Sequence, residues 1–584
     1  MRDSPKLRPS IQAMALLALV LSLPACERPS EPTAEKQAAE QAAAPQAAAP
    51  ASPAPKAHDF SPAIRAEDFA AHVERLASDE FEGRAPGSRG ERLTVEYLTA
   101  HYQRIGLKPA VEGSYLQSVP MVEITRTDEQ PLVLAGEGEP ITLAHMSDVV
   151  LGSTRAEEKV KLADSPLVFL GFGVDAPEYE WNDYEGVDVT GKTVVVLVND
   201  PGFATGDPAL FRGRTMTYYG RWTYKFEEAA RKGAAAALIV HETEAASYPW
   251  EVVQNSWTGP QFELPDPPAR LTVQGWIHLD AARKLFAAAG QDFDALAKAA
   301  AQRGFRPVEL PYRASVEIAQ RIRRAESPNV IGYIEGSEAP DEYVLYMAHW
   351  DHLGRIFGRP GSEGIFNGAI DNATGVAGLL EIAEALAAGP KPRRSIVFAA
   401  LTLEESGLLG SRWYAENPVF PLEKTAAVIN MDALTVIGPT RDVVVVGYGN
   451  SELEDYLKEA AATQNRVVVP EEFPERGYYY RSDHFNFAKK GVPALYAKGG
   501  SDHRERGQAW GKEQLNDYNA NRYHKPGDVF DPNWDLRGVI EDLTLLYDVG
   551  RRVAMEARWP EWYPGTEFRA VREQSRALRE EASR

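Results

Sequence analysis

Four nearly continuous apolar runs in the second half of the chain constrain its fold more than any other feature. They comprise residues 343–348, 396–401, 426–431 and 443–446. Runs of this kind suit strands that are buried on both faces of a sheet. Helical patterns separate several of them, as in residues 375–388, where apolar side chains recur at helical spacing. This alternation predicts an α/β fold with an open, mainly parallel sheet and flanking helices.

Potential metal ligands cluster where these predicted strands end. His349, Asp351, Glu404, Glu405 and Asp432 follow these strands directly. Asp371 leads into the predicted helix of residues 375–388, and Tyr523 and His524 come far downstream. Because sites in open α/β sheets lie beyond the carboxyl ends of the strands, we expect these side chains to meet. Imidazole and carboxylate groups without a thiolate suit zinc or a similar divalent ion in a catalytic site. Any one of these residues alone is typical of a hydrogen-bonded structural position, and only the ordered set favours a site.

The ordered set resembles the zinc-dependent M28 peptidase family, whose members include aminopeptidases and glutamate carboxypeptidases. The resemblance covers residues 66–119 and 329–548. It implies a zinc exopeptidase-like fold that holds two zinc ions per chain. The implied ligands are His349 and Asp432 for one zinc ion, Glu405 and His524 for the other, and Asp371 as a bridge between them. Two metals about 3.5–4 Å apart need such a shared carboxylate to reduce their repulsion.

The same resemblance implies roles for the residues that do not bind metal. Glu404 would be the general base that activates the attacking water. Asp351 would orient His349, since a metal-bound imidazole needs a hydrogen-bonding partner. Tyr523 would help to stabilise the oxyanion. The peptide bond between Asp371 and Asn372 would be cis.

The leading hypothesis is therefore an aminopeptidase that hydrolyses N-terminal residues from peptides. A glutamate-carboxypeptidase-like enzyme is an alternative, and it would need a basic pocket, for which Arg412 and Arg481 are candidates. A glutaminyl cyclase would share the fold but use one zinc ion. A non-catalytic binding protein of the transferrin-receptor kind would have lost ligands, whereas here every ligand position is filled.

Residues 120–313 have a different pattern, with short β-rich runs and one clear strand–helix–strand order. We predict a small β-rich α/β insertion that resembles a protease-associated (PA) domain. The motifs that carry this resemblance are in residues 171–173, 188–192 and 229–234. The peptidase domain would then consist of an N-terminal part, residues 59–119, and a catalytic part, residues 314–560. Residues 561–584 are expected to form a charged C-terminal tail, either helical or frayed.

The N-terminal residues 1–26 combine a basic start with a short apolar run that ends at Cys26. This run is too short to span a bilayer comfortably and is typical of an export signal. Its end resembles the bacterial lipobox, which implies a lipid anchor at Cys26. We expect a lipoprotein of the bacterial cell envelope, attached to the membrane and facing the periplasm. The alternative is a plain signal peptide cleaved near Ala25.

Residues 27–58 are rich in Ala and Pro and lack large apolar side chains. We predict a disordered tether, because such a segment buries too little apolar surface to offset the entropy of ordering. Cys26 is the one cysteine in 584 residues, which excludes a disulfide scaffold. The formal net charge of −21 argues against a general nucleic-acid binder, which would have to attract phosphates.

Overall fold

The computed structural model describes residues 58–136, 138–265, 269–356 and 364–582. The predicted signal peptide, the anchor at Cys26 and nearly all of the tether lie outside the described residues. Within the described ranges, every helix is too short or too polar to cross a membrane.

Three of the four apolar runs form the centre of a mixed sheet with the strand order β1–β13–β17–β14–β18–β21–β19–β20, and the fourth, residues 443–446, lies in β19 outside this centre. Its central strands are β17 (Arg394–Leu401), β14 (Ala339–His349), β18 (Thr425–Asn430) and β21 (Ala494–Gly499). These four strands are mutually parallel, which confirms the predicted parallel sheet. Outside them lie β1 (Lys108–Pro109), β13 (Val308–Ile334), β19 (Asp442–Val445) and β20 (Val467–Pro470). Antiparallel pairs join this centre to β13 and β19.

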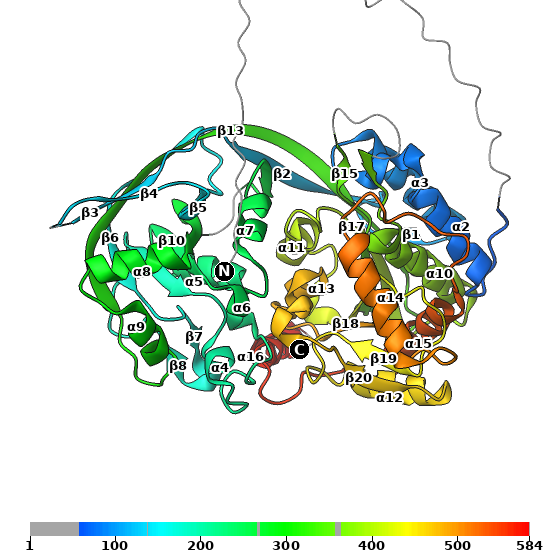
Figure 1. Ribbon diagram of the computed structural model, residues 1–584. Helices are drawn as coiled ribbons and strands as arrows, with labels where there is room; N and C mark the ends of the chain where they lie inside the picture. Colours follow the sequence, from blue (N-terminus) through cyan, green and yellow to red (C-terminus); the bar gives the residue numbers. More distant parts are fainter. Residues whose placement is uncertain (1–57, 137, 266–268, 357–363, 583–584) are drawn as a thin grey trace, which may run out of the picture. The chain divides into compact units, whose positions relative to one another are not determined.

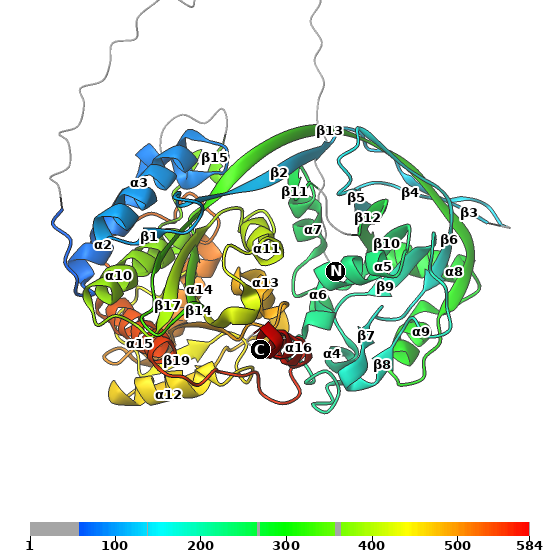
Figure 2. The same ribbon diagram turned by 180° about the vertical axis from the view of Figure 1, so that it is seen from behind.

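Helices cover both faces of the central strands, which explains why the strands are apolar throughout. On one face, Val344 and Tyr346 pack with α10 (Thr374–Ala388) and α15 (Arg537–Met555). On the other face, Leu345 and Met347 pack with the shorter helices α11 (Leu409–Glu416) and α13 (His484–Ala488). Figures 1 and 2 show these helices around β14 and β17.

Two N-terminal helices pack against α10. The first is α2 (Ala66–Leu76), and the second is α3 (Arg89–Ile105). The Ser88 hydroxyl accepts a hydrogen bond from the backbone of Glu91 and caps α3, which ends at Gly106 in the left-handed conformation. Between the helices lies the short 3-10 segment η1 (Asp79–Arg84). It contacts the part of the chain that lies between the candidate ligands His349 and Asp371.

The inserted region forms a second sheet with the order β4–β3–β13–β6–β9–β10–β12–β5. Its strands are β3 (Leu132–Gly136), β4 (Ile141–Leu143), β5 (Val149–Gly152), β6 (Lys159–Phe169), β9 (Thr193–Leu197), β10 (Ala236–His241) and β12 (Val273–His278). Helices α5 (Trp222–Arg231), α8 (Leu279–Ala288) and α9 (Phe293–Ala300) pack on it. This region has its own two apolar clusters, so it buries a core separate from that of the peptidase sheet.

Strand β13 belongs to both sheets, which corrects the predicted boundary at residues 313 and 314. It pairs with β6 near its start and with β17 near its end, while β2 (Leu116–Arg126) pairs with its middle. Figures 1 and 2 show it as one long ribbon. The expected boundary therefore falls inside β13, at a place where its pairing with β6 shifts register but the strand continues. The likeness of this region to a PA domain stays a prediction.

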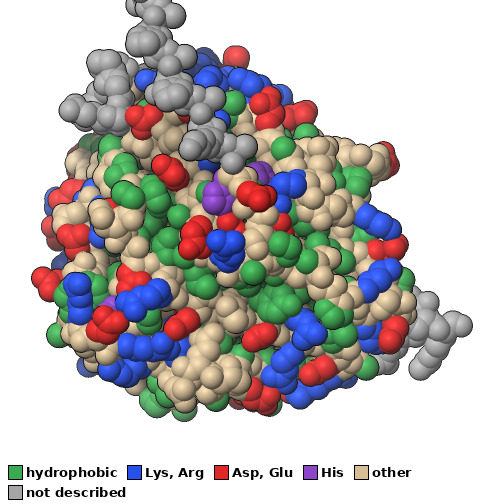
Figure 3. Space-filling view, turned by 90° about the vertical axis from the view of Figure 1, so that its right-hand side faces the viewer, with side chains coloured by type: hydrophobic (Ala, Val, Ile, Leu, Met, Phe, Trp, Pro, Cys, Tyr) green, Lys and Arg blue, Asp and Glu red, His purple; other side chains and the backbone are tan. Residues whose placement is uncertain are grey.

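The C-terminal segment is helical, as one of the two expected forms, but it packs on the fold and is not a free tail. Residues 569–582 form helix α16 (Arg569–Ala582), and Trp562 and Phe568 are buried against the peptidase sheet. The guanidinium of Arg572 donates to the carbonyls of Thr425 and Ala426 at the start of β18. This segment is therefore part of the fold. Figure 3 shows acidic and basic side chains interspersed on one face of the molecule.

Candidate metal centre

The parallel centre of the sheet places three of the predicted site segments next to one another. His349 ends β14, Glu404 follows β17, and Asp432 follows β18. In the strand register, His349 lies beside Leu401, and Met347 lies beside Asn430. The three turns therefore meet at the same edge, as expected for a site at the carboxyl ends of strands.

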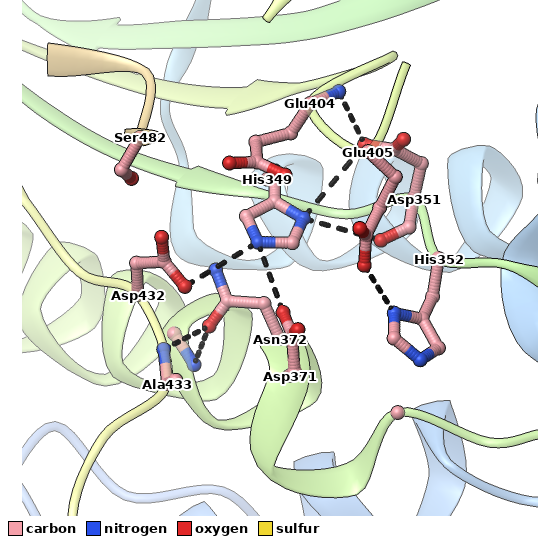
Figure 4. A network of polar contacts seen from close by, with 12 residues as sticks. His349, Asp351, His352, Asp371, Asn372, Glu404, Glu405, Asp432, Ala433 and Ser482 are labelled. Atoms are coloured by element: carbon pink, nitrogen blue, oxygen red, sulfur yellow. Dashed lines mark hydrogen bonds and ion pairs between the residues drawn. The ribbon is translucent and has the colours of Figure 1, made fainter. Parts of the chain in front are cut away.

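Asp371 lies between two histidines and contacts each through a different oxygen. Its Oδ1 is 3.2 Å from Nε2 of His349, and its Oδ2 is 3.1 Å from Nε2 of His524. Nε2 of His349 is also 3.5 Å from Oδ1 of Asp432, and Nε2 of His524 is 3.0 Å from Oε2 of Glu405. The structure thus brings all five predicted ligands together, in two sets that share Asp371. Figure 4 shows His349, Asp371 and Asp432 at the centre of this network.

His352 is a sixth side chain at this site. Its Nδ1 lies 2.5 Å from Oε1 of Glu405, and its Nε2 is buried without a hydrogen-bond partner. Among the described residues, two groups have ligand atoms close enough to hold a metal ion. They are His349, Asp371 and Asp432, and His352, Asp371 and Glu405. His352 thus competes with His524 for Glu405, although the sequence pattern assigned it no ligand role.

The side chain of Asn372 fixes the turn that carries Asp371. This irregular turn, η5 (Ala369–Ala373), lies before α10, and the bond between Asp371 and Asn372 is cis, as expected. The amide of Asn372 donates to the carbonyl of Met431, and its oxygen accepts from the backbone of Ala433 at 3.1 Å. Asn372 therefore ties the Asp371 turn to the segment that carries Asp432.

Glu404 and Glu405 are adjacent in the chain but point to different partners. Glu405 contacts His352 and His524. No described residue donates a hydrogen bond to the Glu404 carboxylate. The backbone N–H of Glu404 donates to Oδ1 of Asp351 at 3.1 Å. In Figure 4 the Glu404 side chain extends toward the side of His349 on which Ser482 and Asp432 lie. One carboxylate of the pair is thus engaged, and the other is left free to exchange a proton.

Asp351 contacts His349 in a different way from the one expected. Its backbone carbonyl, rather than its carboxylate, lies 3.2 Å from Nδ1 of His349. The carboxylate is 3.8 Å from that nitrogen, because Oδ1 is hydrogen-bonded to the backbone of Glu404. Asp351 therefore positions both His349 and the turn that carries Glu404.

Tyr523 stacks on the ring of His524, with the ring centroids 4.0 Å apart. His524 has a φ of 54°, an uncommon backbone conformation for a residue other than glycine. Its side chain is 36% exposed, whereas that of His349 is buried. The His524 side of the centre is therefore the side open to solvent.

Arg84 is a buried residue of this region whose role the sequence analysis did not predict. It is 1% exposed, and its guanidinium donates to four backbone carbonyls, those of Leu76, Trp350, Asn367 and Gly368. Three of them flank the segments that carry His349 and Asp371. Arg84 lies in a segment, residues 81–88, that is rich in Gly and Pro and so reads as a loop. No sequence pattern marks its role, because hydrogen bonds to backbone carbonyls leave none.

The electrostatic environment shifts the pKa values of the two adjacent glutamates in opposite directions. Burial raises the pKa of Glu404 well above its ordinary value, and the carboxylate of Asp432 adds to this rise against the opposing effect of His349. Burial would also raise the pKa of Glu405, but His352 and His524 hold it at about 2. Environments that push two carboxyl pKa values apart are typical of acid–base sites.

These residues fit a bound divalent metal. The carboxylates of Asp371, Asp432 and Glu405 converge on imidazole nitrogens, and Glu404 and Asp351 add further acidic groups nearby. Buried carboxylates are costly unless they are paired or coordinate a metal. The donor set of imidazole nitrogen and carboxylate oxygen is the set that zinc takes in catalytic sites.

Residues 329–547 match the model described as peptidase family M28. This part of the chain is similar to the peptidases of that family. The match spans the predicted ligands and Tyr523, which lie between His349 and His524. The matched segment therefore contains all five predicted ligands, whereas Arg84 lies before it.

Curated proteins similar to part of this chain include an aminopeptidase and a glutamate carboxypeptidase homolog. The mouse "Aminopeptidase NAALADL1" is 38% identical over 123 residues, which cover 20% of this chain and 15% of the mouse protein. The Caenorhabditis elegans "Glutamate carboxypeptidase 2 homolog" is 38% identical over 128 residues, which cover 21% of this chain and 15% of that protein. The chain thus aligns with only about a seventh of the length of these relatives.

Solved structures similar to the chain include an aminopeptidase from Aneurinibacillus sp. strain AM-1, with 18% identity and a TM-score of 0.44. That alignment covers 86% of this chain and 96% of the other. A peptidase M28 precursor from Shewanella amazonensis has 17% identity and a TM-score of 0.38, with coverage of 85% and 97%.

Proposed function

We propose that this chain is a metal-dependent exopeptidase that removes N-terminal residues from peptides. The observation that carries the proposal is the position of Asp371, whose two oxygens each face a histidine that also contacts a second carboxylate. A shared carboxylate between two nitrogen–oxygen sets is what a pair of metal ions requires. The match to the M28 family and the names of its relatives support a peptidase.

We propose two zinc ions per chain. His349 and Asp432 would hold one, Glu405 and His524 would hold the other, and Asp371 would contact both. Bound zinc would supply Lewis-acid polarisation of the scissile carbonyl and make the attacking water more acidic. The side chain of His352 would keep Glu405 oriented through their hydrogen bond.

Glu404 would move the proton in this reaction. Its carboxylate has no hydrogen-bond donor among the described residues, so it can accept a proton from the attacking water. It would then deliver that proton to the leaving amine. Asp351 would hold the Glu404 turn in place through the backbone N–H of Glu404. The Tyr523 hydroxyl would donate to the developing oxyanion.

A glutamate-carboxypeptidase-like activity is the second candidate. One curated relative has that name, and Arg481 is exposed without a carboxylate partner among the described residues. Arg412, the other arginine considered for a basic pocket, is paired with Glu263 at 2.8 Å and with Glu416 at 3.2 Å, which leaves it unsuited to bind substrate.

We also propose that the protein is an exported lipoprotein of the bacterial envelope. The basic start, the short apolar run and Cys26 support this location. The inserted region, as a PA-type domain, would stand beside the peptidase and limit the size of the substrate.

A peptide-library digest read by mass spectrometry tests the proposed function. Trimming from the N-terminus is expected, and trimming from the C-terminus would favour the second candidate. The Glu404→Gln variant should keep its zinc and lose at least about 100-fold in rate. If it hydrolysed peptides at the full rate, the general-base assignment would be wrong.

A further inference from the structure

The turn between β17 and α11, residues 402–408, carries Glu404 and Glu405. Two of its residues, Leu403 and Leu408, have φ angles of 57° and 61°. This left-handed conformation is disfavoured for leucine, because the Cβ atom lies too close to the backbone, and it persists only where the surroundings fix it. The shape of this turn therefore depends on its neighbours.

The Glu404 carboxylate depends on this turn for its position. Since no described residue donates a hydrogen bond to the carboxylate, the side chain has no anchor of its own. The backbone of Glu404 is held instead, because its N–H donates to Oδ1 of Asp351 at 3.1 Å. Its carbonyl accepts from the N–H groups of Gly407 and Leu408 at 3.0 and 2.9 Å. The turn thus determines where the carboxylate can reach.

Asn329 joins the two ends of the turn. It lies in β13 and is fully buried. Its Oδ1 accepts from the backbone N–H of Thr402 at 3.0 Å, and its Nδ2 donates to the carbonyl of Gly410 at 3.0 Å. A Cβ atom on Gly410 would lie only 2.7 Å from that Oδ1, so the glycine makes this close approach possible. One amide group therefore fixes both the entry to the turn and its exit.

Asn486 braces the middle of the turn from another element. It is buried in α13, which packs against α11. Its Nδ2 donates to the carbonyl of Leu408 at 3.1 Å and to the hydroxyl of Ser411 at 2.9 Å. The Ser411 hydroxyl donates to the same Leu408 carbonyl at 3.0 Å. Since the N–H of Leu408 binds the carbonyl of Glu404, this brace is one residue removed from the proposed general base.

The two asparagines act through the backbone of the turn. Within the described part of the chain, neither side chain makes a hydrogen bond with any of the five predicted metal ligands or with the carboxylate of Glu404. An amide side chain offers a donor and an acceptor without charge, so it can satisfy backbone groups of opposite kinds. An aspartate of the same shape could keep the contact with the N–H of Thr402 but not those with the carbonyls.

We propose that Asn329 and Asn486 are positioning residues that hold Glu404 where it can move the proton of the attacking water. This inference rests on the proposed peptidase function and adds to it two residues that touch neither metal nor substrate. A small displacement of a reacting group costs much of the rate, even when its cause lies outside the site. Loosening the turn should therefore slow the chemical step and leave substrate binding nearly unchanged.

Asn329→Asp and Asn486→Asp test this role, because each keeps the size of the side chain and turns an oxygen toward a backbone carbonyl. We expect kcat to fall by about 10- to 100-fold, while KM changes by less than about 3-fold. Asn417→Ala is the matched control. Asn417 is exposed at the end of α11, and its amide donates only to the carbonyl of Trp413 at 3.3 Å. This control should keep both constants.

Combining Asn486→Asp with Glu404→Gln distinguishes positioning from a general structural role. If Asn486 acts through Glu404, its replacement should cost less than about 3-fold once the Glu404 carboxylate is gone. A loss by the same factor in both backgrounds would overturn the proposal. Ser411→Ala, which removes only one partner of Asn486, gives the same comparison if Asn486→Asp does not fold.

Hydrogen exchange of residues 402–411, read by mass spectrometry, separates this inference from the proposed function. Both aspartate variants should raise exchange in this segment, because the turn opens more often. Raised exchange in the variants of a protein whose wild type hydrolyses no peptide would refute the peptidase and support the bracing of the turn. Unchanged exchange together with an unchanged kcat would overturn the positioning role.

Discussion

The carboxylate of Asp528 accepts a hydrogen bond from the backbone N–H of Asp371, with Oδ2 at 3.0 Å from the nitrogen. Its Oδ1 accepts from the backbone of Ile370 at the same distance. Asp528 is buried and lies four residues after His524. The segment that supplies His524 therefore also fixes the turn that supplies Asp371, so the two sides of the centre are positioned together.

Replacing Asp528 should loosen this turn. Asp528→Asn keeps one acceptor oxygen but turns an amide N–H₂ group toward a backbone N–H. We expect zinc affinity and kcat/KM to fall by about 10- to 100-fold, the usual effect of losing a group that orients a ligand. Competition with a chelator and steady-state kinetics measure the two quantities. The exposed Asp531→Asn is the control, and a variant at position 528 with unchanged zinc affinity would contradict this role.

Replacing Arg84 should destabilise the whole peptidase fold. The guanidinium satisfies four carbonyls from segments far apart in the chain, and a lysine cannot reproduce this fork. Arg84→Lys or Arg84→Gln leaves buried carbonyls unpaired, which should cost about 3 kcal/mol or more. Chemical denaturation measures this loss.

Arg92→Gln is the matched control for Arg84. Arg92 is exposed and forms an i,i+4 pair with Glu96 at 3.0 Å, so its loss should cost about 0.5 kcal/mol or less. If Arg84→Gln were as stable as Arg92→Gln, the buried hydrogen bonds would not carry the stability assigned to them.

His101 should make the free energy of unfolding sensitive to mild acid. Burial, and then Arg104, lower its pKa to about 4, and His72 and Tyr97 pack around its ring. Glu384 does not offset this effect, because it pairs with Arg104. Since the unfolded pKa is about 6.5, the unfolded chain binds the proton more tightly, and stability is lost as the pH falls from about 6.5 to 4.

The expected loss from His101 between pH 7 and pH 5 is about 1–2 kcal/mol. Chemical denaturation at the two pH values measures it, and His101→Gln should reduce the difference by that amount. His278→Asn, which keeps a side chain that can cap α8, is the control and should leave the difference unchanged. An equal pH dependence in the wild type and His101→Gln would contradict this assignment.

Cys26 should carry the membrane anchor. We expect Cys26→Ser to abolish incorporation of a labelled fatty acid and to release the protein from the membrane fraction of the cell. Fractionation and labelling of the full chain measure both effects. Labelled protein in the Cys26→Ser variant would show that the anchor lies elsewhere, and an unlabelled soluble wild type would support a plain signal peptide.

The site residues that directly follow buried strands could be predicted from the sequence. His349, Glu405 and Asp432 were predictable because buried parallel strands place their carboxyl ends at one edge, and the family resemblance added Asp371 and His524. Arg84 and Asp528 were missed, because their partners are backbone groups. Arg84 lies 266 residues before Trp350, whose carbonyl it binds, and such a contact leaves no periodic signal.

The fold could also be predicted in part from the sequence. The central strands and α10 came from hydrophobic patterns, which report burial on both faces. The boundary at residues 313 and 314 was wrong, because a pattern of side chains does not show that β13 continues from one sheet into another. The packing of Trp562 against the peptidase was missed, because residues 561–584 were assigned together to a charged tail.

The central claim is that Asp371 joins two metal-binding sets, and the zinc content of the purified protein tests it most directly. Elemental analysis should find about two zinc ions per wild-type chain and about one in His524→Ala, which loses a ligand of one set only. One zinc ion per chain in the wild type, with the same content in His524→Ala, would contradict the claim.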